Sequence, residues 1–378
     1  MKKKNKTDFI TVTLFFGILL SFFVYISIGS IFMEQSSPKR TKDSASPNLL
    51  VQFNAVLTQD ESIKSIVDNL DYRLFRHVSD PNVLLGKHNW LFEIEADESS
   101  YNYLKDYTGG MPYTEEEMAY FSECLAQRKA AYADKGADYL LVVIPNSLSV
   151  CNEAVPRYLG EQSENTRLRR LSEYLKDDGT DCFLNLEQAL EAQGGTALYH
   201  NTEDSLNARG AFFVYDSTMQ VLDSDSYDSE RVLALDDVEF STRTTVGRRI
   251  AKRIGMEKTI RNRTVSLTDI LINRYTVSTK RLYDLTSYGT EPAEDNRAEI
   301  ILAFSRDWDK QQLMPYFSNT FDTAAYQSGL EWNAYLLDRI QPKTVIQFIH
   351  ESELDMIMQE IYAGPYRRHA NSIADNHP

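Results

Sequence analysis

Residues 139–144 read Tyr-Leu-Leu-Val-Val-Ile, and Pro145 follows them. A continuous apolar run of this length is typical of a parallel strand that is buried on both faces. A long polar helix is expected before it, over residues 114–135, with Thr114 as N-cap and acidic residues in the first turn, where the helix dipole favours anions. The run therefore predicts a central strand of an α/β sheet.

The chain on both sides of this run alternates between helical and strand patterns. Such alternation implies three layers, a parallel sheet with helices on both faces. Binding or catalytic groups of such a sheet lie past the carboxyl ends of its strands. Residues 224–296 are rich in Asp, Ser, Thr and Arg, and we interpret them as an irregular insertion. The pattern predicts helices at 163–178, 207–222, 310–317, 332–340 and 351–362, and strands at 182–184, 197–199, 299–304, 323–326 and 344–349.

The amino-terminal part has the pattern of a membrane anchor. Four lysines within residues 2–6 precede a charge-free apolar run over residues 9–33. At about 1.5 Å per helical residue this run can cross a hydrocarbon core of ~30 Å. The lysines place the amino terminus in the cytoplasm by the positive-inside rule, so the bulk of the chain is expected outside the cell membrane. A buried core helix or an uncleaved signal is the alternative.

This anchor sets the predicted domain organisation. Residues 9–33 would contact the lipid bilayer as a single-pass helix, and the globular part would follow a juxtamembrane linker and a helical stalk. The predicted segments are a cytoplasmic tail 1–8, a transmembrane helix 9–33, a linker 34–47, a stalk 48–85, an α/β domain 86–362 and a disordered tail 363–378.

Composition excludes several functions. A formal net charge of −15 argues against a nucleic-acid partner, which would require a basic face. The three cysteines, Cys124, Cys151 and Cys182, form no CxxC pair, and the six histidines show no HxH or HxxxH spacing, so no metal site and no cofactor are expected. One disulfide bridge remains open.

Four segments resemble, in chain order, motifs of the SGNH-hydrolase-like proteins of polysaccharide O-acetylation, typified by AlgJ, AlgX and the DHHW proteins. Residues 86–92, Gly-Lys-His-Asn-Trp-Leu-Phe, resemble the family's GKDGWLF, and 142–147, Val-Val-Ile-Pro-Asn-Ser, its strand ending in PxKS. Residues 199–211, Tyr-His-Asn-Thr-Glu-Asp-Ser-Leu-Asn-Ala-Arg-Gly-Ala, resemble YxxTDTHWNPxGA. Residues 299–317 resemble its strand followed by RDSF and LLPYL. The resemblance implies an SGNH-hydrolase-like α/β domain.

In that family, a carboxylate and a histidine of the third motif polarise a serine of the fourth, which carries an acetyl group to a sugar hydroxyl. The resemblance places other residue types at these positions. The orienting acid falls on Glu203 and the histidine on Ser205, while the nucleophile falls on Trp308, or on Asp307 if one residue is inserted. A triad without its serine or base loses about six orders of magnitude in turnover. The resemblance therefore implies a degenerate catalytic site.

Two residues could substitute for the missing ones. Ser305 directly follows a predicted strand and could be a displaced nucleophile, with His200 as a displaced base. The plainer interpretations are a turn residue that caps the next helix and a histidine at a strand edge.

The remaining polar residues of the two loops also have two interpretations each. Glu203 and Asp204 could form an acid and base pair, or they could cap the helix that starts near residue 207. Trp308 could stack on a sugar ring or pack in the interior. The candidate binding residues are Asn146, Asp204 and Arg306.

The leading functional hypothesis is a membrane-anchored, catalytically degenerate component of a cell-surface polysaccharide O-acetylation system. It would bind the polysaccharide or accompany a multipass membrane O-acyltransferase. The alternatives are an active O-acetyltransferase or acetylesterase with a rearranged serine site, and a structural envelope protein.

Overall fold

The computed structural model describes residues 72, 78, 80–95, 101–222, 227–270, 275–280, 283–289 and 297–359. The chain divides into two units, residues 1–67 and 68–378, and everything described belongs to the second. The predicted cytoplasmic tail, anchor, linker, most of the stalk and the tail 363–378 lie outside the described residues. Within the described part, no helix has the length and apolar character needed to cross a membrane.

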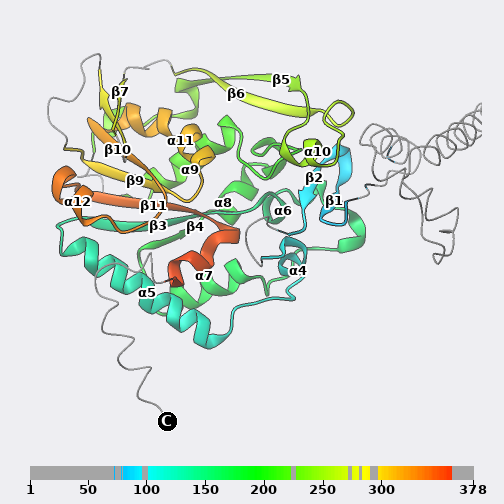
Figure 1. Cartoon of the computed structure of the whole chain (residues 1–378), viewed down its shortest axis with the longest axis horizontal. Helices are drawn as coiled ribbons and strands as arrows, with labels where there is room; N and C mark the ends of the chain where they lie inside the picture. Colours follow the sequence, from blue (N-terminus) through cyan, green and yellow to red (C-terminus); the bar gives the residue numbers. More distant parts are fainter. Residues whose placement is uncertain are drawn as a thin grey trace, which may run out of the picture. The chain divides into compact units, whose positions relative to one another are not determined.

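A mixed seven-stranded sheet forms the centre of the second unit (Figure 1). Its first five strands are parallel, whereas β8 pairs antiparallel with β10 and β7 pairs antiparallel with β8. The prediction of an all-parallel sheet is therefore wrong at one edge. In spatial order the strands are β4 (Phe183–Asn185), β3 (Asp138–Ile144), β11 (Thr344–His350), β9 (Ile300–Phe304), β10 (Thr323–Ser328), β8 (Asp284–Tyr288) and β7 (Tyr275–Thr279).

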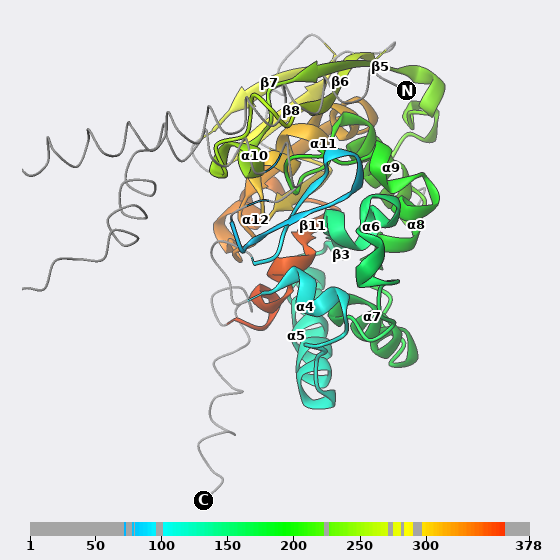
Figure 2. The ribbon, with the colours of Figure 1, turned by 90° about the vertical axis from the view of Figure 1, so that its right-hand side faces the viewer.

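Helices cover both faces of this sheet (Figures 1 and 2). The side chains of β3 alternate between two cores: Val142 packs in the core that contains α9 and α11, and Leu141 in the core that contains α5, α7 and α12. The expected α/β architecture with helices on both faces is thereby confirmed. The helices are α5 (Glu115–Ala133), α7 (Arg167–Asp177), α9 (Ala208–Met219), α11 (Asp307–Thr320) and α12 (Ala334–Ile340), with the shorter α4 (Tyr103–Tyr107), α6 (Ser147–Val150) and α8 (Glu187–Ala192).

The start of α5 shows the local chemistry that was expected from the sequence. The Thr114 hydroxyl accepts a hydrogen bond from the backbone N–H of Glu117 at 3.2 Å, and the Glu117 carboxylate accepts one from the Thr114 backbone at 2.8 Å. This reciprocal arrangement is a capping box, which satisfies donors that a helix start leaves free. The predicted N-cap is confirmed.

Two predicted elements differ from the structure. Residues 197–199 are not a strand: a 3-10 helix (Gly195–Ala197) precedes an isolated bridge between Tyr199 and Leu206. A Cβ atom at Gly195 would collide with the carbonyl oxygen of Val150, so the chain turns closely against its neighbour here. The last predicted helix is a 3-10 helix, η8 (Glu351–Met358).

The described parts of residues 224–296 contain more regular structure than predicted. They contain a long antiparallel ribbon of β5 (Val238–Thr245) and β6 (Asn262–Ile270), joined through α10 (Arg249–Arg253), as well as β7 and β8. The predicted stalk is also wrong at its end, because residues 83–85 form β1, which pairs with β2 (Leu91–Glu93) in a hairpin. A hairpin entering the core here agrees with the turn glycine and apolar residues of 86–92.

Candidate functional site

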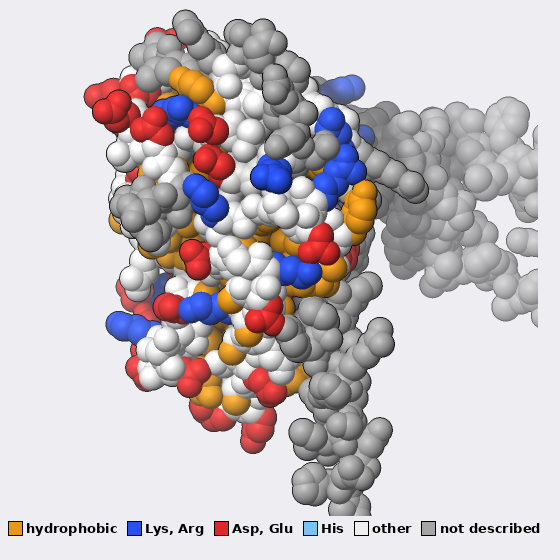
Figure 3. Space-filling view, turned by 90° about the vertical axis from the view of Figure 1, so that its left-hand side faces the viewer, with side chains coloured by type: hydrophobic (Ala, Val, Ile, Leu, Met, Phe, Trp, Pro, Cys, Tyr) orange, Lys and Arg blue, Asp and Glu red, His pale blue; other side chains and the backbone are white. Residues whose placement is uncertain are grey.

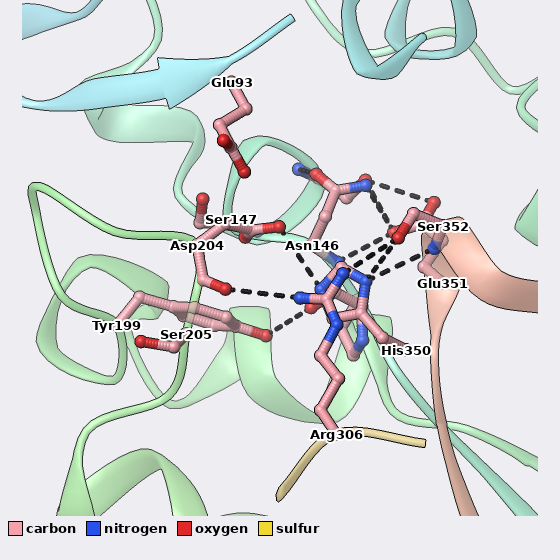
Figure 4. A network of polar contacts seen from close by, with 12 residues as sticks. Glu93, Asn146, Ser147, Tyr199, Asp204, Ser205, Arg306, His350, Glu351 and Ser352 are labelled. Carbon is pink, nitrogen blue, oxygen red and sulfur yellow. Dashed lines mark hydrogen bonds and ion pairs between the residues drawn. The ribbon is translucent and has the colours of Figure 1, made fainter. Parts of the chain in front are cut away.

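The carboxyl ends of three adjacent parallel strands meet at one polar centre (Figure 4). Ser147 follows β3, Arg306 follows β9, and His350 ends β11. The loop that contains Asp204 lies opposite these strand ends, since the backbone N–H of Ser147 donates to its carboxylate at 2.7 Å. Sites of open α/β sheets lie in this position.

Asp204 and His350 are in contact at this centre. Oδ2 of Asp204 lies 3.3 Å from Nε2 of His350, and both side chains are buried. Burial raises the pKa of the Asp204 carboxyl, but the adjacent His350, the Arg306 guanidinium and the Ser147 N–H outweigh it and hold this pKa well below its usual range. Asp204 is therefore a carboxylate throughout the physiological pH range.

The other ring nitrogen of His350 faces Ser352. Nδ1 lies 2.9 Å from the Ser352 hydroxyl oxygen and also accepts from the Ser352 backbone N–H at 3.3 Å. Nη2 of Arg306 donates to the same hydroxyl oxygen at 3.0 Å, while Nε of Arg306 donates to Glu353 at 2.9 Å. Because Nδ1 accepts a backbone N–H, the ring proton is placed on Nε2, toward Asp204.

Glu351 lies next to this centre and is fully enclosed. Its Oε2 accepts from the backbone and the side-chain amide of Asn146, at 2.8 and 2.6 Å, and from the Ser149 hydroxyl at 3.1 Å. Burial and the nearby Asp106 raise the pKa of Glu351 well above its ordinary value. Asn146, one of the predicted binding residues, is thus engaged in holding the start of α6 to the end of β11.

Glu203, Ser205 and Trp308, which the resemblance places at triad positions, also come together. The Ser205 hydroxyl donates to Glu203 at 3.2 Å, and Glu203 accepts from the Arg248 guanidinium at 3.0 Å. That guanidinium lies 4.8 Å above the Trp308 ring, and the Trp308 indole N–H donates to the carbonyl oxygen of Leu206 at 3.1 Å. The two polar loops therefore face each other, with a tryptophan and an arginine at their junction.

The two candidate substitute residues are not brought together by any described contact. His200 is buried, and its Nδ1 lies 3.1 Å from Nδ2 of Asn262. Burial, and to a smaller extent the positive charge of Arg248, lowers the pKa of His200 to about 3. Such an imidazole is a weak base at neutral pH. The Ser305 hydroxyl accepts the backbone N–H of His350 at 3.1 Å, so it ties β9 to β11 and does not cap α11.

The cap of α9 and the buried acid at the start of α11 are not the residues that the sequence suggested. Asn207, and neither Glu203 nor Asp204, caps α9 by accepting from the N–H groups of Arg209 and Gly210. Asp307 is exposed in the first turn of α11. Asp309, two residues later, is buried, and burial raises its pKa to about 6 against the opposing charge of Arg306.

Sequence reasoning missed His350, Ser352 and Arg248. His350 directly follows the predicted strand 344–349, so the rule that sites lie at carboxyl ends of strands could have singled it out. Its partner Asp204 is remote in the sequence, and no short motif joins them.

Among the described residues, no group of histidine, cysteine and acidic side chains could hold a metal ion. All three cysteines are free and buried, so the bridge left open is not formed.

Comparison with known proteins supports the resemblance to this family. Residues 83–269 match the family model described as the SGNH hydrolase-like domain of acetyltransferase AlgX. This range includes three of the four motif-like segments and ends before the fourth. Among curated proteins, none matches the chain. The resemblance expected from the motifs is confirmed.

Several solved structures are similar to this chain. PatB1 of Bacillus cereus, with a sulfonyl adduct, superimposes with a TM-score of 0.52 at 11% sequence identity, covering 73% of this chain and 97% of that one. The O-acetyltransferase domain of Pseudomonas putida AlgJ gives a TM-score of 0.47 at 12% identity, with 79% and 100% covered. A DHHW family protein from Eubacterium siraeum gives 0.46 at 12% identity, with 74% and 96% covered. The match to PatB1 supports a shared fold.

Proposed function

Because residues 83–269 form an SGNH hydrolase-like domain of the AlgX acetyltransferase family, we propose that this protein serves the O-acetylation of a cell-surface polysaccharide without transferring the acetyl group at the family's triad position. It acts as an accessory or glycan-binding component. The polysaccharide is its ligand, and a multipass membrane O-acyltransferase that supplies acetyl groups is its partner. Residues 9–33 anchor it in the cell membrane, with the domain on the extracytoplasmic side.

One observation carries the non-catalytic assignment. The resemblance places Trp308, or Asp307 if one residue is inserted, at the nucleophile position. The Trp308 indole N–H is bound to Leu206, and Arg248 covers its ring. Acyl transfer needs a hydroxyl or thiol within hydrogen-bond reach of a base. The adjoining positions supply Glu203 and Ser205, which bind each other and Arg248.

The test has two parts. The purified full-length chain in detergent should release no 4-nitrophenol from 4-nitrophenyl acetate above the rate in buffer. In the cell that produces it, deletion of the gene should lower the O-acetyl content of the surface polysaccharide, and a Trp308→Ala, Arg248→Ala variant should fail to restore it. Turnover by the purified chain would contradict the non-catalytic assignment, and an unchanged acetyl content would contradict the role in O-acetylation.

A second candidate function is favoured by the polar centre of Figure 4. There, a serine hydroxyl, an imidazole and a carboxylate are lined up as Ser352, His350 and Asp204, at 2.9 and 3.3 Å. In an active transferase, the Ser352 oxygen would attack the carbonyl of an acetyl ester while its proton passes to Nδ1 of His350. The leaving alkoxide would take that proton, and a sugar hydroxyl would then attack the acetyl-serine, returning its own proton through His350 to Ser352.

Two matched variants separate this candidate from the first. If the chain turns over 4-nitrophenyl acetate, Ser352→Ala should abolish the rate. Ser305→Ala should leave the rate within about twofold, because Ser305 contacts the backbone N–H of His350 and the Glu353 carboxylate but has no described contact with the His350 ring. Loss of activity in Ser305→Ala alone would instead support Ser305 as the nucleophile, the displaced serine that the sequence suggested.

A further inference from the structure

A polar hollow lies at the end of the central sheet opposite the candidate site. Three of its lining residues directly precede parallel strands: Glu299 before β9, Asp322 before β10 and Lys343 before β11. Its volume is about 110 Å³, whereas one water molecule needs about 10–15 Å³, so a small organic molecule fits. Figure 3 draws the side of the molecule on which α12 leads into β11, and acidic and basic side chains are interspersed there.

Hydrogen bonds of the sheet fix the floor of this hollow. The backbone N–H of Lys343 donates to the carbonyl oxygen of Glu299 at 2.9 Å, and the N–H of Glu299 donates to that of Thr323 at 3.0 Å. The N–H of Asp322 donates to Oε2 of Glu299 at 3.0 Å, which holds this carboxylate in place. The lining residues before the three strands are therefore positioned by the fold.

Arg231 occupies one wall of the hollow, and its charge is already used. It ends the 3-10 helix η6 (Ser229–Arg231), and its guanidinium binds Asp322 and, at 3.2 Å, Asp228. The carbon at the centre of this guanidinium also lies 4.3 Å from the centre of the Tyr288 ring. Arg231, Asp228 and Asp322 thus bind one another.

Glu299 and Lys343 carry the charges of the hollow that are left over. Glu299 is half-buried, and Lys343 is exposed. Within the part of the chain that the structure describes, neither side chain has an oppositely charged group at ion-pair distance. One unpaired carboxylate and one unpaired ammonium group therefore line the same small space, and each attracts a charge of the opposite sign.

We propose that this hollow binds a small zwitterion, an amino acid whose ammonium group contacts Glu299 and whose carboxylate contacts Lys343. In an amino acid both charged groups are attached to one carbon atom, so a small hollow can hold them together. The Tyr227 ring lines the hollow and packs edge-on against Phe321, with ring centres 5.9 Å apart, so it offers an apolar surface to a short side chain. The site is independent of the proposed function, because it lies at the other end of the strands.

Ligands with a single charge match the hollow less well. A carboxylate alone could pair with Lys343, but it would also meet the three acidic side chains, those of Asp228, Glu299 and Asp322. An ammonium group alone could pair with Glu299, but it would lie beside the ammonium of Lys343. Since like charges at short distance repel, only a ligand with both charges has each of them compensated.

The experiment uses the full-length chain in detergent and a ligand-observed NMR titration, which detects weak binding. The ligands are glycine, L-alanine, acetate and methylammonium, of which the last two each carry one of the two charges. Glu299→Gln removes the carboxylate charge but keeps an oxygen that can accept the Asp322 N–H, and Lys343→Gln removes the ammonium group. The matched control, Glu173→Gln with Lys176→Gln, removes one charge of each sign from exposed positions of α7.

The unmodified chain should bind glycine or L-alanine at least about tenfold more tightly than acetate or methylammonium. Glu299→Gln and Lys343→Gln should each weaken amino-acid binding by about five- to tenfold, and the control should stay within about twofold. Thermal unfolding checks that each variant is folded, and Lys343→Gln, at an exposed position, tests the proposal by itself if Glu299→Gln is not. Acetate or methylammonium binding as tightly as the amino acids would overturn the proposal. Undetectable binding of both amino acids, or equal losses in the control, would overturn it as well.

Discussion

Oδ2 of Asp204 lies 3.3 Å from Nε2 of His350 in the protein interior, and this contact joins the loop between Tyr199 and Leu206 to the end of β11, the last strand of the chain. The loop bearing Asp204 is the one in which the family places its catalytic acid and histidine. The buried carboxylate next to that position is therefore engaged with an imidazole from β11.

Replacing Asp204 by Asn should lower the free energy of unfolding by about 3–5 kcal/mol at pH 7, since it removes one partner of a buried pair and leaves His350 without its carboxylate. Urea denaturation followed by far-UV circular dichroism measures the loss. Glu203→Gln is the control, because its pair with Arg248 is partly exposed, and its effect should stay below about 1 kcal/mol. Equal effects would contradict the importance of the Asp204 contact.

The same pair predicts a dependence on pH. The pKa of Asp204 is held below its ordinary value of 3.8, so its contribution to stability is present above that value and is lost as pH falls through and below it. The difference in stability between the unmodified chain and Asp204→Asn should be constant from pH 5 upward and shrink toward pH 3. A difference in stability that grows as the pH falls would contradict this prediction.

The effect of Asp309 on stability should depend on pH in the opposite direction. Burial raises its pKa to about 6, so the folded protein holds a proton there that the unfolded chain releases near pH 4. Stability is lost as pH rises from about 4 to about 6, and Asp309→Asn should stabilise the protein by about 2 kcal/mol at pH 7 but hardly at pH 4. Thermal unfolding of both proteins at the two pH values measures this. Destabilisation at pH 7 would show that the carboxylate is needed in charged form.

Gly210→Ala should destabilise the protein by about 1–3 kcal/mol. A Cβ atom at Gly210 would meet the carbonyl oxygen of Leu198 and would lie 2.8 Å from Cδ2 of Leu206, so α9 has to move away from the loop. Arg209→Ala, at the exposed neighbouring position of the same helix, controls for helix propensity and should change stability by less than about 0.5 kcal/mol. Chemical denaturation distinguishes the two.

Rebuilding the family's triad tests whether its geometry has survived. Glu203→Asp, Ser205→His and Trp308→Ser together should give slow but measurable hydrolysis of 4-nitrophenyl acetate, because the two loops already face each other. The matched control carries Trp308→Ala in place of Trp308→Ser and should stay at the buffer rate. Equal rates in both would show that the new serine takes no part.

The sheet could be predicted from sequence where its strands are apolar on both faces. Residues 139–144, 299–304 and 344–349 all lie in strands of the centre, because only a doubly covered sheet buries such runs. The strands β5, β6, β7 and β8 were missed, since their Ser, Thr and Arg residues carry no such signal. β6 pairs with β5 across α10, and β8 pairs with β10, which lies far away in the sequence, while β7 pairs with the adjacent β8.

The candidate site was predictable only in part. The loops of Glu203 and Trp308 could be placed opposite each other because a strand was predicted before each, although residues 197–199 form a 3-10 turn and an isolated bridge instead of a strand. The pairing of Asp204 with His350 could not, because it depends on β11 lying between β3 and β9, and no local pattern encodes the order of strands in a sheet. Arg248 was missed for the same reason, as it reaches the site from the ribbon.

Strand β8 has a consequence for anyone who wishes to shorten this protein. Excising residues 224–296 as a dispensable loop would remove the strand that borders β10 and leave the N–H and C=O groups of Ala324 to Tyr326 open along the whole rim of the sheet. Bare rims of this kind recruit strands from other molecules. The trimmed chain would therefore precipitate or form mixed aggregates during expression, even with the other strands of the sheet intact.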